Sequence, residues 1–332
     1  MYSTRNRNKK LNIGIIGCGD IVQRVHLPVL LNIPKVHIRF IYDTDVAKSE
    51  KVSRDFKVAA IADEQDIPWN EINCFLIAIP YDARSTVYEK LAKRLHDQQF
   101  LFIEKPVILS QQDLRFFQEY NLFRRIFSGF MRRHYSNTNI LKQFIENFGV
   151  ERIKNIRIAE GFKTTATGLK RSGGILAETA CHLLDQVNYL LPQFDCAVLA
   201  AATVYDDTAD VHVDAKLLLK SSGLAIPISA TFSRLENLSS GIFLNFGDLQ
   251  LETGVAPQDT VFISGRDFTH KHQIRPLPAY AVSSYQAFYL EWLSAINHIM
   301  SGVPSPNLLS QSFLSGLMIE SLQRQTTKEF IS

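Results

Sequence analysis

The sequence contains few cysteines, and none of them stand at a metal-binding or redox spacing. Its 332 residues include four: Cys18, Cys74, Cys181 and Cys196. No two of them form a CxxC pair, and none stands with histidine at the spacing of metal ligands. The sequence therefore indicates neither a disulfide framework nor a structural zinc site, and we expect no metal.

The chain also lacks a long hydrophobic run and a strong excess of charge of one sign. Its first apolar stretch, LNIGIIG at 11–17, is too short for a signal-peptide core and holds two glycines, and nothing approaches a membrane span. The net charge is +3, and no basic face or interleaved aromatic stripe accompanies it. We therefore expect a soluble, cytoplasmic protein with neither a membrane nor a nucleic-acid partner.

What the chain does contain is a regular alternation of elements through its first third. Its length favours two domains over one core. Longer amphipathic stretches, among them one that starts at Asp45, separate short apolar runs that we predict to be strands, at 11–17, 36–43, 74–80 and 99–106. Near-continuous hydrophobicity is typical of parallel strands buried on both faces. The pattern predicts an α/β fold with a doubly wound, Rossmann-type parallel sheet in a domain over residues 1–128.

The pattern changes in the remaining part, residues 129–332. Several apolar runs between 196 and 265 follow one another without helices between them, which favours an open, mainly antiparallel sheet. Helices are predicted at 136–148, after a glycine-rich turn within 172–190, and at about 284–301 and 307–322, the last able to pack back on the first domain. We assign this part to a second α/β domain.

A glycine motif, GIIGCGDIVQRVH at 14–26, follows the first strand and opens a helix. Gly17 permits a tight turn, and Gly19 lets the backbone approach a pyrophosphate. The amides of Asp20, Ile21 and Val22 would then point at the phosphate from the positive helix end. Val22 occupies the third small position of the fingerprint, which should shift the helix or loosen its packing.

Asp43 ends the second strand, where a carboxylate accepts hydrogen bonds from an adenosine ribose and repels a 2′-phosphate. The cofactor expected is therefore NAD in preference to NADP. Asp43 could instead cap the following helix.

A second unusual stretch is QFLFIEKPVIL at 99–109, where Glu104 and Lys105 interrupt an apolar run. If this stretch is a surface turn, water solvates the two charges. If the stretch is buried, the charges need partners, because burial of an unpaired charge costs several kcal/mol.

The chain resembles the Gfo/Idh/MocA family of oxidoreductases (glucose–fructose oxidoreductase and inositol dehydrogenase) over nearly its whole length. The motifs that carry the resemblance are GIIGCGDIVQRVHLP, AIPYDAR, EKP, GFMRRH and GGILAETACHLLD. It implies that Glu104, Lys105, Ile79 and Pro80 lie beside the nicotinamide, with Pro106 fixing the turn. It also implies a substrate-binding second domain whose open sheet builds homodimers or homotetramers.

The same resemblance makes Lys105, His182 and Glu178 the catalytic candidates. A free lysine has a pKa of about 10.4, so a basic Lys105 needs a pKa lowered by about 2–3, whereas an unperturbed His182 already titrates near neutral pH. We expect His182 to exchange the proton while Lys105 polarises the oxygen, and the reverse division stays open. Glu178 stands where the family has aspartate, one turn before His182.

Weaker substrate-binding candidates are Arg133, Lys170, Arg171 and Asp185. The positive charge of Arg132, Arg133, Lys170 and Arg171 would suit a phosphate or nucleotide group on the sugar. Tyr81 and Arg84 depart from the family's asparagine and histidine. We thus expect an NAD(P)-dependent oxidoreductase that acts on a secondary alcohol or ketone of a sugar, nucleotide sugar or cyclitol. Two alternatives remain: a nicotinamide-assisted glycosidase of the same fold, and a non-catalytic dinucleotide-binding sensor.

Overall fold

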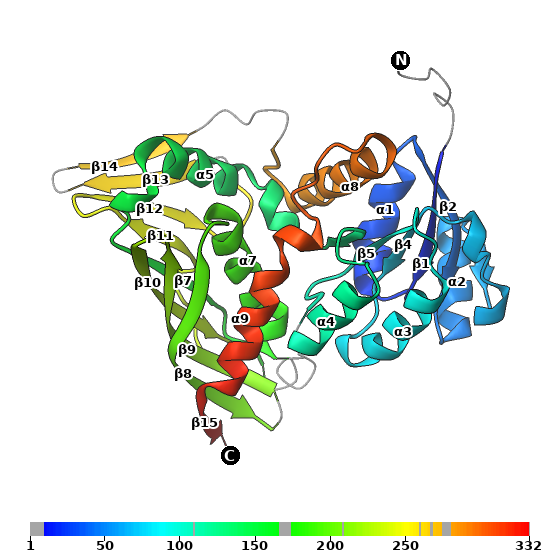
Figure 1. The fold of residues 1–332 in the computed structure, drawn as a ribbon, viewed down its shortest axis with the longest axis horizontal. Helices are drawn as coiled ribbons and strands as arrows, with labels where there is room; N and C mark the ends of the chain where they lie inside the picture. The colour runs from blue at the N-terminus through cyan, green and yellow to red at the C-terminus, as the bar shows by residue number, and fades with distance from the viewer. Residues whose placement is uncertain are drawn as a thin grey trace. The chain divides into compact units, whose positions relative to one another are not determined.

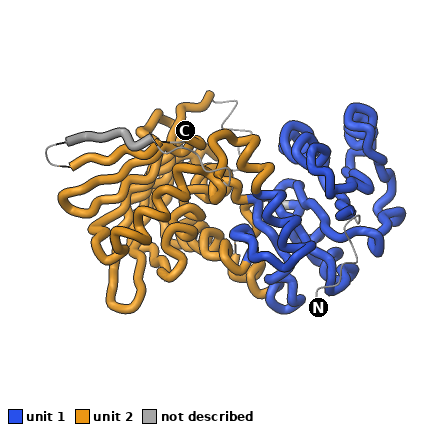
Figure 2. Tube along the Cα trace, turned by 90° about the horizontal axis from the view of Figure 1, so that it is seen from above, with its two compact units in different colours: residues 1–104, 116–129, 291–309 blue, residues 105–115, 130–290, 310–332 orange. Residues whose placement is uncertain are grey.

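The structure is a computed structural model, which describes residues 10–108, 110–165, 174–207, 209–258, 260–265, 268–273 and 280–331. The chain divides into two compact units, which Figure 2 distinguishes by colour. Unit 1 comprises residues 1–104, 116–129 and 291–309, and unit 2 comprises residues 105–115, 130–290 and 310–332. The chain therefore first enters unit 2 at Lys105, the residue after Glu104.

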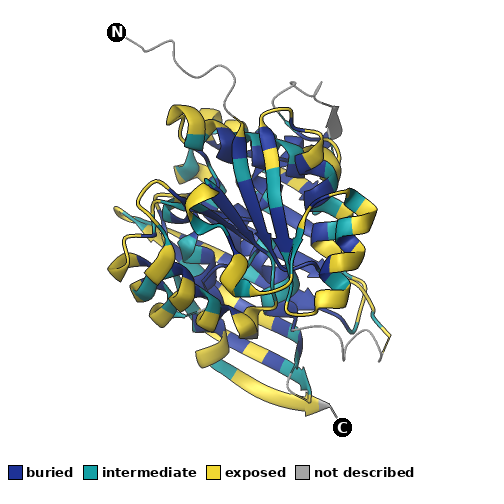
Figure 3. Cartoon of the chain, turned by 90° about the vertical axis from the view of Figure 1, so that its right-hand side faces the viewer, coloured by how far each residue is buried: buried dark blue, intermediate teal, exposed yellow. Residues whose placement is uncertain are grey.

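Unit 1 is built around a parallel sheet with the strand order β3-β2-β1-β4-β5-β6. Figure 1 labels four of these strands, β1, β2, β4 and β5. The strands are β1 (Leu11–Ile16), β2 (Val36–Tyr42), β3 (Ala60–Ile61), β4 (Cys74–Ile77), β5 (Phe100–Ile103) and β6 (Ile126–Ser128). Nearly every residue of β1, β4 and β5 is buried, as their apolar runs predicted, and Figure 3 shows these strands between helices with exposed outer faces. The order reverses between β1 and β4, and open α/β sheets bind ligands at such a switch point.

Helices connect these strands. They are α1 (Leu27–Leu31), α2 (Val46–Phe56), α3 (Arg84–Arg94) and α4 (Gln111–Glu119). A further helix, α8 (Ser284–Ser301), follows β14 in the chain. Asp45 caps α2, because its carboxylate accepts a hydrogen bond from the Lys48 amide at 3.1 Å. Among the helices that the structure describes, none combines the length and the hydropathy that a bilayer crossing needs.

Unit 2 contains a larger sheet with the strand order β14-β13-β12-β11-β7-β10-β9-β8-β15. Its strands are β7 (Asn155–Gly161), β8 (Asp195–Asp206), β9 (Ala209–Ser221), β10 (Leu224–Ser233), β11 (Gly241–Asn245), β12 (Leu249–Gly254), β13 (Thr260–Gly265), β14 (Phe268–Gln273) and β15 (Thr326–Ile331). Neighbours pair antiparallel except β7 with β10 and β8 with β15. The predicted fold class, a Rossmann-type sheet plus a mainly antiparallel one, is confirmed.

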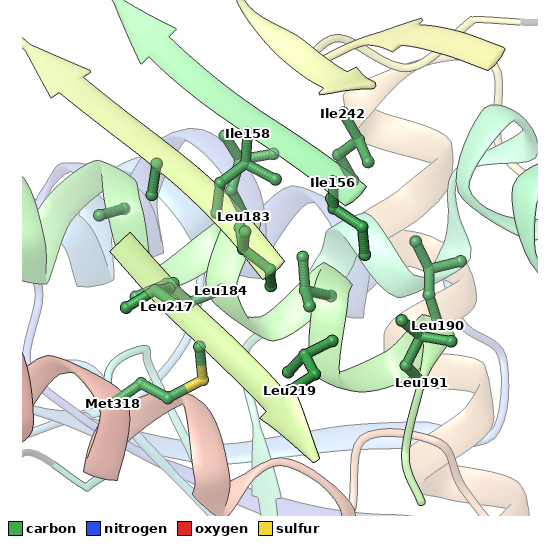
Figure 4. Close-up of a cluster of buried hydrophobic side chains, with 14 of the residues drawn as sticks. Ile156, Ile158, Leu183, Leu184, Leu190, Leu191, Leu217, Leu219, Ile242 and Met318 are labelled. Atoms are coloured by element: carbon green, nitrogen blue, oxygen red, sulfur yellow. The ribbon is translucent and has the colours of Figure 1, made fainter. Parts of the chain in front are cut away.

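One face of this second sheet packs against helices. The helices are α5 (Ser136–Phe148), α7 (Cys181–Leu190) and α9 (Phe313–Arg324). Figure 4 shows Ile156 and Ile158 of β7 meeting Leu183 and Leu184 of α7 in this core. Burial alternates along the strands, so every second residue faces the helices. Glu160 continues the inward row of β7, which places a charge at the end of an apolar face.

Candidate active site

The two glycines that follow β1 differ in what surrounds them. Gly17 has a φ of +100°, and a Cβ there would lie 2.3 Å from the carbonyl oxygen of Ala78. Only glycine is compatible with both the dihedral angle and this approach of the neighbouring strand end. A Cβ on Gly19 would meet nothing within 4 Å, so the backbone at Gly19 borders open space.

The helix that begins after Gly19 is distorted in its second turn. Val22 is fully buried and starts a π-helical turn over Val22–His26, which fits the predicted effect of a large side chain at the third small position. The Val22 amide donates to the Gly19 carbonyl at 3.1 Å. Of the three amides expected to face a phosphate, that of Val22 is thus engaged, and those of Asp20 and Ile21 lie at the open end of the helix.

Asp43 links the glycine turn to the end of β2. Its carboxylate accepts hydrogen bonds from the amide of Cys18 at 2.7 Å and from the amide of Asp45 at 3.0 Å. Asp45, not Asp43, caps α2, so the geometry does not support the capping alternative. Burial and the charge of Asp43 raise the pKa of Cys18 to about 12, which keeps this thiol protonated.

A cavity of about 380 Å³ opens beside this turn, within the range of small-molecule sites, about 300–1,000 Å³. Five of the predicted cofactor residues line it together: Gly17, Gly19, Asp43, Ile79 and Pro80. Asp20, Ile21, Val22, Glu104 and Lys105 are not among its lining residues.

The remaining walls of the cavity were not anticipated from the sequence. Ile67, Trp69 and Leu91 form an apolar part, while Thr44 and Lys48 lie beside Asp43 at the polar part. An open glycine turn, a carboxylate and an apolar wall are what the pyrophosphate, ribose and adenine of a dinucleotide require. The residues present therefore fit such a cofactor.

The carboxylate of Glu104, the residue after β5, is buried and hydrogen-bonded. Nε2 of His26 lies 2.7 Å from a Glu104 oxygen, and the indole of Trp292 donates to Nδ1 of His26 at 2.9 Å. Because an indole can only donate, Nδ1 is an acceptor and the His26 proton resides on Nε2. The hydrogen bonds from Trp292 to His26 and from His26 to Glu104 explain how an apolar strand can be followed by a buried carboxylate.

Arg84, which stands where the family has histidine, joins two strand ends. Its buried guanidinium donates to the carbonyl of Ile79 at 3.0 Å and to that of Glu104 at 2.6 Å. It thereby holds the carboxyl ends of β4 and β5 together. Tyr81, the other departure, is exposed, and the Arg84 guanidinium lies 6.0 Å from its ring centre.

In unit 2, Lys105 and Glu178 are in direct contact. Nζ of Lys105 donates to the backbone carbonyl of Glu178 at 2.7 Å, and the Lys105–Pro106 peptide bond is cis. The Glu178 carboxylate points elsewhere and forms an ion pair with Arg234 at 2.5 Å. Glu178 therefore binds two cations, one through its main chain and one through its side chain.

His182 lies one turn further along, with its ring edge-on to Phe130 at 6.1 Å between ring centres. Within the described part of the chain, its Nδ1 has no hydrogen-bond partner. Burial first, and then the charges of Arg132 and Lys105, lower the pKa of His182 well below its usual value. This corrects the expectation of an imidazole that titrates near neutral pH: His182 is neutral there.

Three residues complete this group: Arg132, which the sequence suggested as positive charge on the substrate side, and Glu160 and Arg234, to which it gave no role. Arg132 forms a two-bond ion pair with Glu160, at 2.9 and 2.8 Å, and Arg234 pairs with Glu178. Glu160 and Arg234 end apolar strands, as Glu104 does, and that signal could have found them. We name the group the charged cluster: Lys105, Arg132, Glu160, Glu178, His182 and Arg234.

The predicted substrate-binding residues Arg133 and Asp185 bind each other instead. Their two hydrogen bonds measure 2.7 and 2.6 Å, and both side chains are 1% exposed. Arg133 also donates to the carbonyl of Gln311 at 3.0 Å. This geometry leaves neither group for a substrate. Lys170 and Arg171 lie outside the described residues.

The fold and the cavity place this protein among those with a Rossmann-type dinucleotide-binding domain. Residues 11–120 match the model of the oxidoreductase family with an NAD-binding Rossmann fold, which confirms the resemblance to the Gfo/Idh/MocA family. No curated protein matches the chain.

Solved structures show the same fold over almost the whole chain. The chain is similar to KijD10, a 3-ketoreductase from Actinomadura kijaniata in complex with NADP and TDP-benzene, with a TM-score of 0.79, 14% identity and coverage of 98% of this chain and 100% of that one. It is also similar to a dehydrogenase (MviM) from Clostridium difficile, with a TM-score of 0.73, 16% identity and coverage of 95% and 99%. A protein from Sinorhizobium meliloti 1021 that is described as a myo-inositol dehydrogenase has a TM-score of 0.67, 17% identity and coverage of 95% and 98%.

Proposed function

We propose that this protein is an NAD(P)-dependent oxidoreductase that transfers hydride between the nicotinamide and a secondary alcohol or ketone of a sugar, nucleotide sugar or cyclitol. The observation that carries the proposal is the bond from Lys105 Nζ to the Glu178 carbonyl at 2.7 Å, one helical turn before His182. Lys105 is the second residue after β5, and the unit 1 cavity fits a dinucleotide. The likeness to a 3-ketoreductase in complex with NADP and TDP-benzene, and to described dehydrogenases, supports the proposal.

When bound, the nicotinamide supplies or accepts the hydride. The chain's own residues then have to hold and move a proton at the substrate oxygen. The lowered pKa of His182 makes a resting imidazolium unfavourable at neutral pH. We therefore favour the division in which Nζ of Lys105 exchanges the proton and neutral His182 hydrogen-bonds the same oxygen. The charges of Arg132 and Lys105 oppose protonation of His182.

NAD is the preferred cofactor in this proposal, because the Asp43 carboxylate lines the cavity where a ribose hydroxyl would bind. A cytoplasmic location and a homodimer or homotetramer are part of the same proposal, and the family resemblance supports the oligomer.

The proposal is tested by a spectrophotometric screen of sugars, sugar phosphates, nucleotide sugars and cyclitols against NAD and NADP. We expect one class of compound to oxidise or reduce the added cofactor. A glycosidase that only borrows its cofactor would release product without net turnover of added NAD. Dinucleotide binding with no reaction on any compound would contradict the oxidoreductase and leave the sensor.

A further inference from the structure

The polar part of the dinucleotide cavity carries balanced charge. Two carboxylates line it, Asp43 and Glu64, and each is paired with a lysine that also lines it. Lys48 of α2 lies 3.3 Å from Asp43, and Lys90 of α3 lies 2.6 Å from Glu64.

The pairing of Asp43 with Lys48 affects how strongly the Asp43 carboxylate can exclude a 2′-phosphate. An unpaired carboxylate in this position repels a 2′-phosphate and so selects NAD. The Asp43 carboxylate already accepts two backbone hydrogen bonds, from Cys18 and Asp45, and the Lys48 ammonium offsets its charge. The repulsion of a 2′-phosphate is thereby reduced.

Lys48 is also free to change partners without a change in the backbone. Its amide is bound by the Asp45 cap at 3.1 Å, which fixes the first turn of α2. Its side chain is 39% exposed and forms the longer of the two lysine pairs. Lys90 is held more closely, and its partner Glu64 also lies 3.8 Å from Arg94.

We propose that Lys48 binds the 2′-phosphate of NADP, so that this cavity takes NADP as well as NAD. With NAD, Lys48 stays on Asp43 and the carboxylate accepts from the ribose hydroxyl. With NADP, the ammonium moves to the phosphate as a point-charge partner. The inference rests on the proposed function only in that the cavity holds a dinucleotide.

The test compares Lys48→Met with Lys51→Met. Methionine keeps the apolar stem and removes the charge. Lys51 lies on the same helix, pairs with Asp55 at 3.1 Å and does not line the cavity, so it is the matched control. Calorimetry measures dissociation constants for NAD, NADP, 5′-AMP and adenosine 2′,5′-bisphosphate, and the last two probe the cavity without nicotinamide.

We expect Lys48→Met to weaken NADP and the bisphosphate by about 10- to 100-fold, as loss of one charged hydrogen bond implies, and to change NAD and AMP little. Lys51→Met should match the wild type for all four. An unchanged ratio of NADP to NAD affinity in Lys48→Met would overturn the proposal, and so would a loss that appears only in Lys90→Met.

The wild type separates this inference from the proposed function. Binding of NAD and AMP without measurable binding of NADP or the bisphosphate would overturn the role of Lys48 alone. Failure of all four compounds to bind would overturn both.

Discussion

Nζ of Lys105 donates a hydrogen bond to the main-chain carbonyl of Glu178 at 2.7 Å. A bond to the main chain does not depend on which acid stands at 178, where the family that this chain resembles has aspartate. The side chain of Glu178 instead reaches Arg234. Compared with aspartate, the extra methylene of glutamate therefore alters the contact with Arg234.

Replacement of Glu178 by glutamine should leave the Lys105 bond intact and break the ion pair with Arg234. The Arg234 side chain is mostly buried while Glu178 is partly exposed, so we expect a loss of about 1–2 kcal/mol in the free energy of unfolding. Urea denaturation of both single variants and of Glu178→Gln with Arg234→Met gives the coupling. Strictly additive effects would show that the pair is not coupled.

The two glycines of the turn should respond differently to alanine. Gly17→Ala places a Cβ against the Ala78 carbonyl at a positive φ, so the melting temperature should fall. Gly19→Ala meets no protein atom within 4 Å, so it should fold normally but weaken dinucleotide binding, because the methyl group enters the cavity. Thermal unfolding and calorimetry distinguish the two. Normal NAD affinity in Gly19→Ala would mean that the pyrophosphate does not approach this residue.

Loss of one partner of the Arg133–Asp185 pair should destabilise the fold more than loss of both. Arg133→Met alone leaves a buried carboxylate without its partner and should cost about 3–5 kcal/mol in the free energy of unfolding. Adding Asp185→Leu should recover most of that loss. For comparison, Lys51→Met removes an exposed pair and should change stability by less than about 1 kcal/mol. A double variant as unstable as the single one would contradict this account.

His182 should make the protein sensitive to mild acid. Its pKa is lowered in the folded state, so below the unfolded value of about 6.5 the unfolded chain binds a proton that the folded chain does not. As the pH is lowered below about 6.5, the free energy of unfolding should therefore decrease, by at most about 1.4 kcal/mol per pH unit. Above about pH 6.5 the contribution of His182 to the free energy of unfolding is constant.

The matched variant is His182→Gln, which lacks this proton uptake. Burial raises the pKa of Asp210 to about 6, which acts in the opposite direction, but its effect is common to both proteins. The difference in unfolding free energy between wild type and variant should therefore shift steadily as the pH falls from about 7 to about 5. A constant difference over that range would mean that His182 titrates normally.

Local features of the sequence predicted much of this molecule. The apolar runs at 11–17 and 74–80 gave buried parallel strands, and Asp45 caps its helix because capping depends on neighbouring residues alone. The glycine motif and the strand-end acid meet in one cavity, since a Rossmann turn brings them together by its topology.

Features that depend on distant partners could not be predicted. β15, with the polar sequence TTKEFI, is a strand only because it pairs with β8. Arg133 resembled a substrate ligand until its partner Asp185 was known. The lowered pKa of His182 follows from burial and from Arg132, neither of which a sequence pattern contains.

The most direct test of the account is the rate of hydride transfer in Lys105→Met, measured with the substrate that the screen identifies. Lys163→Met, an exposed lysine of the same unit, is the control. We predict a rate lower by about 10²- to 10⁴-fold, with dinucleotide affinity unchanged and the control at the wild-type rate. A Lys105→Met enzyme that turns over as fast as the wild type would contradict the central claim.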